Sequence, residues 1–425
     1  MIRLIQFEMK KLIKSNFFRI MLLVFCLFIV VFYVFVHINT TKVEEVISEW
    51  KFNVHLWQGW VDDMVDSIDS GEVQEDKMMI REIDRYRNIG AEYEAILNAY
   101  EEKDWKFILN SEIKRDENEL DILIYKKEYY SSVFPTLFTR ETQMEYQKWL
   151  RDKEIVPVLR IGGDLTWTTV YDEIFIMSNG QDEILEEELV MKYSNKYSST
   201  GIYYLNLLGL LFFGIFGAVF FLFLFGDIVT KEGIGRNGPI NLLHTQPIQR
   251  GKILASKLFA MLILSIFILV GTSVISLALG TTFDSFGFWN YPVLIYGEDY
   301  SHSFMNMSTF IIKSALFFLM ILLFCYSILF LYSILTKKAS TALVLTVATF
   351  ILGIKFSGES ALISTAPFIP FHYFSVPKVI TMELAASLGN FNFTFSNGLL
   401  TLGISSIMIF IAIYIILVVQ YRYSG

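Results

Sequence analysis

The sequence predicts an all-α polytopic membrane protein with six transmembrane helices and a large, mainly helical extracytoplasmic domain between spans one and two. Three observations lead to this fold class. Hydrophobic residues make up 54% of the 425 residues and the mean hydropathy is +0.47, which is too apolar for an ordinary soluble protein. Uncharged runs long enough to cross a bilayer recur along the chain. Charge is also divided unequally between one long segment and the remainder.

The long acidic segment covers residues 42–196. It holds 19 Lys/Arg and 35 Asp/Glu, a net charge of −16, whereas the rest of the chain holds 16 and 8, a net charge of +8. This division predicts that the two parts lie on opposite sides of the bilayer. Both cysteines, Cys26 and Cys325, fall inside apolar runs, so packing alone must hold the exported segment together.

The chain begins with an expected amphipathic interfacial helix over residues 1–16. Apolar residues such as Ile5 and Met9 recur there at three-and-four spacing, with Lys10 and Lys14 largely opposite, although a plain basic flank of the first span is the alternative. Residues 17–41 form the expected transmembrane helix 1. No cleavage site of small residues follows, so this helix is expected to remain as an anchor.

The extracytoplasmic domain is expected to open with a coiled-coil-like hairpin over residues 42–104. Apolar residues alternate gaps of four and three along its first helix and resume after a turn at residues 69–71. Helical patterns recur at about 118–133, 141–153 and 181–195, and a β-rich stretch at 165–177 is either a short strand or an irregular loop. The acidic clusters favour a solvated face, with a cation or cationic-peptide site as the alternative.

The other expected spans are uncharged runs whose connectors alternate in charge. The loop from Asp284 to Asn306 carries three acids and no Lys/Arg, whereas Lys337 and Lys338 form a tight basic turn. Basic connectors stay inside, so both termini are expected to be cytoplasmic. Transmembrane helices 2 to 6 are expected at 197–226, 258–283, 310–336, 339–356 and 398–421.

Residues 357–397 lie between the last two spans and are expected to form re-entrant or extracytoplasmic capping helices. Prolines at 367, 370 and 377 interrupt the segment, while its aromatic residues make it too apolar for a free loop. Backbone that breaks at membrane depth must be buried in protein or face water.

Residues 227–257 form a short connector between two spans, with five Lys/Arg against two acids, and are expected to be cytoplasmic. Glycines break the helix that leaves the membrane, Leu242 and Leu243 mark a short apolar helical turn, and Pro247 stops it. This pattern predicts a small helix that lies across the membrane face.

The connector contains, in order, Glu, Gly, Leu-Leu-x-x-Gln-Pro-Ile-x-Arg and then Lys. Together with the order of the spans, this pattern resembles the first intracellular connector of type 2 ABC transporter permeases. The resemblance implies a coupling helix that docks in a cleft of a separate ATPase subunit. Arg236 departs from the family, which often has Thr after the glycine. The implied docking residues are Asp227, Glu232, Gly235, Leu242, Leu243, Gln246, Pro247, Arg250 and Lys257.

The phrase from Ala366 to Phe374 is similar to the short helices that cap the outer end of the pathway in these permeases. The implied capping residues are Pro367, Pro370, Phe371, Tyr373 and Phe374.

The sequence contains no phosphate-binding loop, no HExxH and no GxSxG motif, and no metal site is expected. The chain is therefore expected to be no enzyme and to need no cofactor of its own, with ATP and Mg on the partner subunit.

The function that the resemblance implies is a permease subunit of an ABC exporter for an amphipathic or peptide-like substrate. Two ATPase subunits, a second permease copy or a homologous permease, and membrane lipids are its expected partners, with no nucleic acid, in a bacterial plasma membrane. The alternative is a non-transporting membrane sensor or immunity protein that binds a cationic peptide through its acidic outer domain. An intramembrane enzyme would need a buried catalytic pair, which we do not find.

Overall fold

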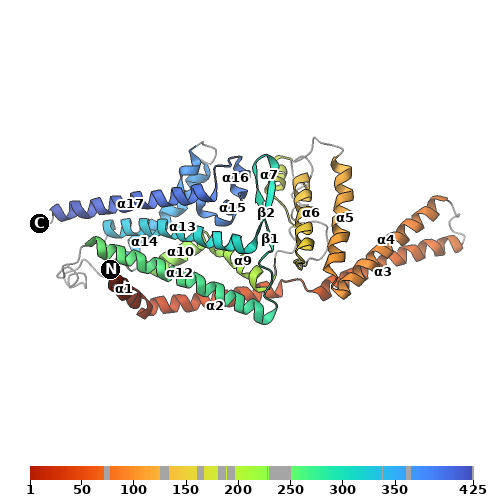
Figure 1. The fold of residues 1–425 in the computed structure, drawn as a ribbon, viewed down its shortest axis with the longest axis horizontal. Coiled ribbons are helices and arrows are strands. Elements are labelled where there is room, and N and C mark those ends of the chain that lie inside the picture. Colours follow the sequence, from red (N-terminus) through yellow and green to blue (C-terminus); the bar gives the residue numbers. More distant parts are fainter. Residues whose placement is uncertain are drawn as a thin grey trace. The chain divides into compact units, whose positions relative to one another are not determined.

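The chain folds into two compact units. The computed structural model describes residues 1–70, 77–124, 134–159, 167–179, 188, 197–226, 228, 250–336, 338–359 and 365–423. One unit, here called the bundle unit, contains Met1–Phe35, Ser199–Trp289 and Val293–Gly425. The other, here called the insert unit, contains Val36–Ser198 and the short piece Asn290–Pro292. Both are mainly helical, as the sequence predicts (Figure 1).

The bundle unit contains the candidate membrane spans. Among the described residues, five helices are long and apolar enough to cross a bilayer, and a bent pair of helices makes a sixth if it counts as one span. Its helices are α1 (Ile2–Lys14), α2 (Asn16–Ile38), α9 (Gly201–Phe212), α10 (Ile215–Phe225), α12 (Arg250–Phe283), α13 (Met307–Thr336), α14 (Ala339–Glu359) and α17 (Phe395–Tyr423).

The predicted second span is divided into α9 and α10, which meet at an angle of 75°. Phe213 leaves helical geometry with φ −80° and ψ 75°, and Gly214 is fully extended. A Cβ on Gly217 would lie 2.1 Å from the carbonyl oxygen of Phe212, so only glycine permits this close return of the chain. Sequence periodicity alone indicates one continuous helix here, because every residue around the break is apolar.

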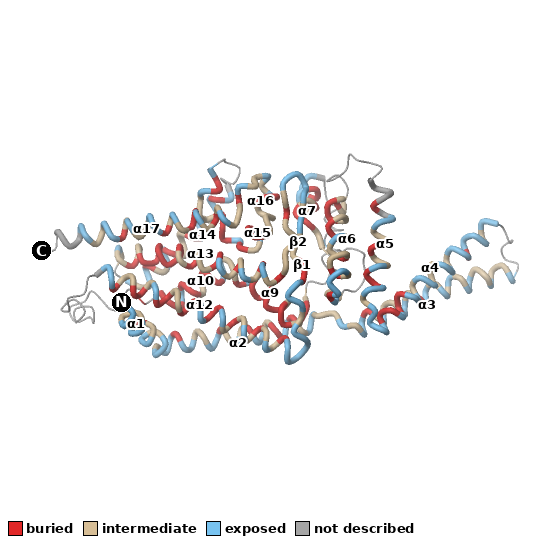
Figure 2. The backbone as a smooth tube through the Cα atoms, viewed as in Figure 1, coloured by how far each residue is buried: buried red, intermediate tan, exposed pale blue. Residues whose placement is uncertain are grey.

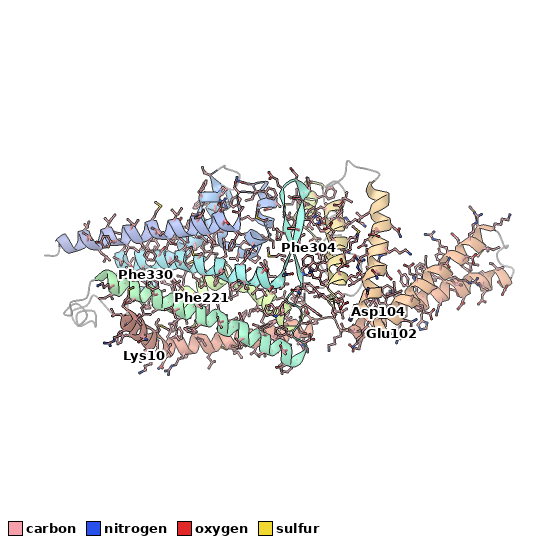
Figure 3. The ribbon with its side chains drawn as sticks, viewed as in Figure 1. Lys10, Glu102, Asp104, Phe221, Phe304 and Phe330 are labelled. Carbon is pink, nitrogen blue, oxygen red and sulfur yellow. The ribbon has the colours of Figure 1, made fainter. Side chains whose placement is uncertain are left out.

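Helix α13 is the centre of the bundle. Of its most apolar stretch 67% is buried, compared with 17–28% for the other long spans. It packs against α9, α10, α12, α14 and α17. Phe221 on α10 and Phe330 on α13 are both fully buried (Figure 3). Exposed positions recur along α2, α12, α14 and α17 (Figure 2). Many of them carry large apolar side chains, as expected where hydrocarbon is the solvent.

Helix α1 packs along α12 by one side. The side facing the protein contains Leu4, Met9 and the buried Glu8, whereas Ile2 and Phe7 are exposed. A carboxylate therefore lies within the protein-facing side of this helix, whereas two apolar side chains are exposed.

Short elements join the spans at the end of the bundle away from the N-terminus. Strands β1 (Pro292–Tyr296) and β2 (His302–Asn306) pair around the 3₁₀ helix η1 (Glu298–Tyr300), in a loop for which the sequence predicts only acidic character. Between α14 and α17 the chain forms η2 (Ala366–Phe368), η3 (Pro370–Phe374), α15 (Val376–Ile380) and α16 (Glu383–Leu388).

The insert unit consists of five described helices, α3 (Val43–Asp69), α4 (Lys77–Glu102), α5 (Trp105–Ile124), α6 (Leu137–Asp152) and α7 (Val170–Asn179). Helices α3 and α4 pair along aromatic side chains, with ring centroids 5.0 Å apart for Trp50 and Tyr93 and 5.5 Å apart for Trp57 and Tyr86. The two helices predicted at 118–133 and 181–195 lie mostly outside the described residues, which include only 118–124 and 188 of these ranges.

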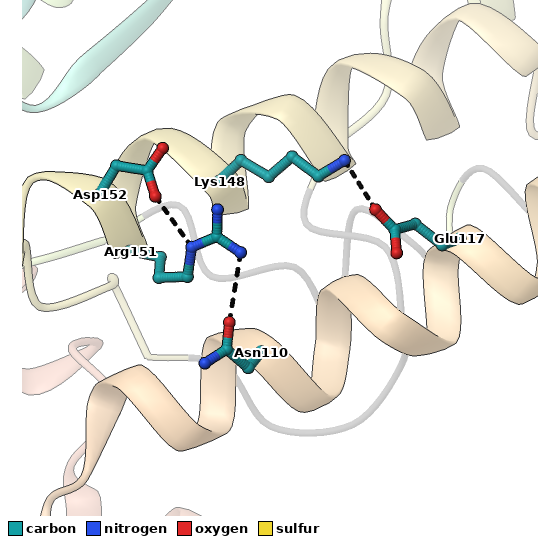
Figure 4. A network of polar contacts seen from close by, with 5 residues as sticks. All are labelled: Asn110, Glu117, Lys148, Arg151 and Asp152. Carbon is teal, nitrogen blue, oxygen red and sulfur yellow. Dashed lines mark hydrogen bonds and ion pairs between the residues drawn. The ribbon is translucent and has the colours of Figure 1, made fainter.

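Helix α5 packs against α6 through polar contacts as well as apolar ones (Figure 4). The Lys148 ammonium lies 2.8 Å from a carboxylate oxygen of Glu117, and Arg151 donates to the Asn110 side chain at 3.2 Å. These pairs are largely exposed, so they fix the alignment of α5 along α6 more than they stabilise the packing of the two helices.

The strand or irregular loop expected at 165–177 is wrong for residues 170–177, which belong to helix α7. Thr169 and Asp172 explain the difference. The Thr169 N–H donates to Asp172 Oδ2 at 2.7 Å, which satisfies a backbone donor at the start of α7. This local cap outweighs the β propensity of the Val, Tyr, Ile and Phe residues that follow.

Asp172 is fully buried and accepts hydrogen bonds from several donors that come from two helix starts. Its Oδ1 accepts from the Thr136 N–H at 2.7 Å, and its Oδ2 also accepts from the Thr139 hydroxyl. The carboxylate therefore joins the first turn of α6 to the first turn of α7.

We expect Asp172→Ala to destabilise the insert unit by about 3 kcal/mol, because it leaves buried donors unsatisfied. Tryptophan fluorescence during thermal unfolding in detergent measures this, since six of the seven tryptophans lie in residues 42–196. Asp152→Ala is the matched control, because Asp152 is exposed at the end of α6. Equal unfolding temperatures for the two variants would contradict this role for Asp172.

Candidate functional site

Two parts of the bundle unit carry the residues to which the sequence assigns function, the connector between α10 and α12 and the capping segment (residues 365–394) between α14 and α17. Most of the connector lies outside the described residues. This applies to the expected docking residues Asp227, Glu232, Gly235, Leu242, Leu243, Gln246 and Pro247. Arg250 is the first residue of α12, and Lys257 lies two turns further along the same helix.

The two ends of the connector meet inside the bundle. Helix α10 ends at Phe225, and the Ile228 N–H donates to the Phe225 carbonyl at 3.0 Å. The Lys257 ammonium donates to the Ile228 carbonyl at 2.9 Å. Both side chains are buried, with 4% of Ile228 and 3% of Lys257 exposed. Lys257 therefore contacts its own chain in the structure, whereas the family resemblance places it among the docking residues.

The end of α10 also contacts the start of α14. A Cβ on Gly226 would lie 2.9 Å from Leu343 Cδ1 and 3.0 Å from the Leu222 carbonyl oxygen. The end of α10 is thus packed closely against α14 just before the connector begins.

The five expected capping residues come together against α13, α14 and α17. Tyr373 is fully buried and its hydroxyl donates to the Pro367 carbonyl at 2.7 Å. Ring centroids lie 5.7 Å apart for Phe371 and Phe324, and 5.3 Å apart for Phe374 and Phe350. Pro370 begins the 3₁₀ helix that carries the three aromatic residues.

The capping segment reaches the middle of the bundle. Phe324, which contacts Phe371, lies near the midpoint of α13. The sequence leaves open whether the capping segment is re-entrant or extracytoplasmic, and this position favours the re-entrant arrangement. The Pro367 carbonyl accepts a second hydrogen bond from Thr401 of α17 at 3.1 Å, so the broken backbone is satisfied within the protein.

The capping segment also lies against the break in the second span. A Cβ on Gly214 would be 3.2 Å from the Phe374 carbonyl oxygen. Two irregular backbone segments, far apart in the sequence, therefore meet within the bundle. No sequence signal identifies this contact, because both segments are apolar and their separation exceeds any local pattern.

The sequence also gives no indication of a contact made by the loop after α12. Its residues Asn290–Pro292 are part of the insert unit. The Trp149 indole donates to the Asn290 carbonyl at 3.0 Å, the Val158 N–H donates to the Tyr291 hydroxyl at 3.1 Å, and the hydroxyls of Tyr146 and Tyr291 lie 2.5 Å apart.

The same loop continues into β1, which contacts the capping segment. The Tyr296 N–H donates to the Thr381 carbonyl at 2.9 Å, just after α15. One short stretch of chain thus has hydrogen bonds to the insert unit at Tyr291 and to the capping segment at Tyr296.

These features define a multi-pass helical membrane protein with a bent pair of helices, an irregular segment between α14 and α17 and a large insertion after α2. Residues 2–418 match the model of the ABC-2 family transporter proteins. The chain therefore belongs to this family of ABC transporter permeases, whose members lack an ATPase domain. Searches of curated proteins and of solved structures found no match.

We expect Gly353→Ala to loosen the capping segment. A Cβ at this position would lie 2.5–2.7 Å from three ring atoms of Phe371, so the ring must move, at a cost of about 1–3 kcal/mol. Gly358→Ala on the same helix is the control, because its Cβ would meet no atom within 4 Å. Thermal unfolding in detergent measures both variants, and a Gly353→Ala protein as stable as the control would contradict the packing described.

The insert unit should lose stability in alkaline solution through Tyr291. Burial raises the pKa of Tyr291 from 10.0 to about 12. The folded chain keeps this proton after the unfolded chain has released it, so the contribution is complete below pH 10 and is lost as the pH rises to about 12. We expect the difference in unfolding temperature between wild type and Tyr291→Phe to be constant below pH 10 and to shrink above it. A difference that does not change up to pH 12 would disprove this account.

Proposed function

We propose that this permease forms the export pathway of an ABC transporter for an amphipathic or peptide-like substrate. Two copies of a separate ATPase subunit would drive it, and a second copy or a homologous permease would complete the pathway. The observation that carries the proposal is the family match over residues 2–418, because it includes the connector and the large insertion as well as the spans.

In this proposal residues 227–257 are the coupling element. Leu242, Leu243 and Pro247 supply an apolar plug that docks in the ATPase subunit, while Glu232 and Arg250 set its orientation. Closure of the ATPase dimer can move the permease only if the connector binds the closed and open dimers with different free energies. That difference would tilt the helices at either end of the connector, α10 and α12.

The meeting point of Gly214 and Phe374 is the proposed gate of the pathway. Discontinuous helices at membrane depth are tolerated where they are buried in protein or line a water-filled cavity, and they often mark transport sites. The aromatic side chains of the capping segment suit a substrate with an apolar part.

We further propose that both termini are cytoplasmic and that residues 42–196 are extracytoplasmic, in a bacterial plasma membrane. The net charge of −16 on that segment, against +8 for the remainder, supports this orientation. The exposed Ile2 and Phe7 of α1 suit contact with membrane lipids.

Leu243→Asp should abolish most of the ATPase stimulation, because it places a charge in the apolar plug. We expect the amount of ATPase subunit that copurifies with the tagged permease, and its ATP hydrolysis, to fall about tenfold or more. Asn241→Asp is the matched control, since it adds the same charge two residues away. Wild-type behaviour of Leu243→Asp would contradict the docking role, and a wild-type chain that copurifies no ATPase would favour the sensor or immunity function instead.

A further inference from the structure

The contact between Lys257 and Ile228 joins the two ends of the connector. Residues 229–256 separate them in sequence, yet the ammonium of one lies 2.9 Å from the carbonyl oxygen of the other. Both belong to the bundle unit. The hydrogen bond therefore links α12, two turns from its start, to the chain that leaves α10.

We infer that Lys257 is a positioning residue of the coupling connector, which fixes α12 to the chain leaving α10 so that both helices move together when the connector is displaced. The inference rests on the proposed function, because it assigns to this contact the transmission of movement from the docked connector. It moves Lys257 from the docking surface to the interior of the permease.

The electrostatics of the site suit an ammonium group. The chain that leaves α10 presents the carbonyl groups at the C-terminal end of a helix, where the helix dipole concentrates negative charge. A lysine that is 3% exposed requires such partners, because an unpaired buried charge is strongly unfavourable. The long lysine side chain spans between the two helices, whereas a shorter polar residue on α12 would not extend as far.

The geometry also explains why the hydrogen bond between Lys257 and Ile228 lies at this position. The Ile228 N–H is bonded back to Phe225, so Ile228 continues the last turn of α10 and is not a free loop residue. Lys257 is followed directly by the apolar run of α12. The hydrogen bond therefore lies at the junction between the connector and the two spans, where force from the connector enters the bundle.

The test compares Lys257→Met with Lys257→Arg in the complete complex with its ATPase, reconstituted in lipid nanodiscs. A single reporter cysteine replaces Phe368, which is 74% exposed in the capping segment, after Cys26 and Cys325 have been changed to serine. The measured quantity is the change in the maleimide modification rate at position 368 when the ATPase is trapped with ADP and vanadate. Copurified ATPase and ATP hydrolysis are measured in the same samples.

For Lys257→Met we expect normal copurification of the ATPase and continued ATP hydrolysis. The vanadate-dependent change in modification rate at position 368 should fall about tenfold, which is the size expected for the loss of one hydrogen bond to a charged group. Lys257→Arg keeps a donor and should retain more of the change. Lys338→Met, an exposed lysine in the turn between α13 and α14, is the control and should behave as wild type.

A full response at position 368 in Lys257→Met would overturn the inference. Loss of the ATPase from this variant would also overturn it, because Lys257 would then act in docking. Failure of the proposed function is distinguishable from both, since no ATPase would then accompany the wild-type chain.

A second measurement applies if Lys257→Met does not fold. Cysteines at positions 228 and 257 are joined with a thiol-reactive linker of about the length of a lysine side chain. The cross-linked complex should keep the response at position 368. Loss of the response on cross-linking, with ATP hydrolysis intact, would show that the two ends must separate and would overturn the inference.

Discussion

Inside a bilayer no water is present to satisfy the polar groups of the backbone, and the bundle unit depends on this constraint throughout. Its long helices meet the constraint through their own hydrogen bonds. The two places where helices stop within the bundle need other partners. At the break after α9, the Gly214 N–H donates to the Phe212 carbonyl at 3.0 Å, and in the capping segment the Pro367 carbonyl accepts from Tyr373 and Thr401.

Aromatic side chains and glycines act together to hold these irregular segments. Rings of Phe318, Phe324 and Phe350 fill the space around them, with centroids 5.3–5.7 Å from rings of the break and the capping segment. Glycines at 214 and 353 let backbone or ring atoms approach where a Cβ would collide or crowd. The arrangement combines a broken backbone with dense packing, so a change of state requires several contacts to rearrange together.

The loop after α12 contributes residues to both compact units. Tyr291 belongs to the insert unit, where it contacts Val158, and five residues further on the Tyr296 N–H donates to the Thr381 carbonyl within the bundle unit. At the other end of the bundle, Lys257 ties the connector to the spans. Both ends of the bundle thus contain a hydrogen bond between segments that a moving permease must either keep or break.

The sequence alone determined the properties that depend on local composition and period. The apolar runs predicted long helices that the bundle unit contains, although α12 begins at Arg250 and not at residue 258 as expected. The heptad pattern predicted paired helices where α3 and α4 lie, and the prolines predicted an irregular capping segment. The family resemblance on the connector agrees with the match over nearly the whole chain. These features depend on neighbouring residues, which a single sequence displays directly.

Only the tertiary structure decided the bend between α9 and α10, the inward position of Lys257 and the capture of Tyr291 by the insert unit. Each depends on a partner distant in sequence or on a backbone approach that several residue types could suggest equally well. From the sequence, Gly217 is an ordinary small residue of an apolar helix, and only the structure shows how close the Phe212 carbonyl lies. Likewise, the sequence predicts a surface position for Lys257, and only the structure shows its hydrogen bond to Ile228. Hydrogen bonds and close contacts between remote segments leave no period in the sequence, and for that reason they had to be observed.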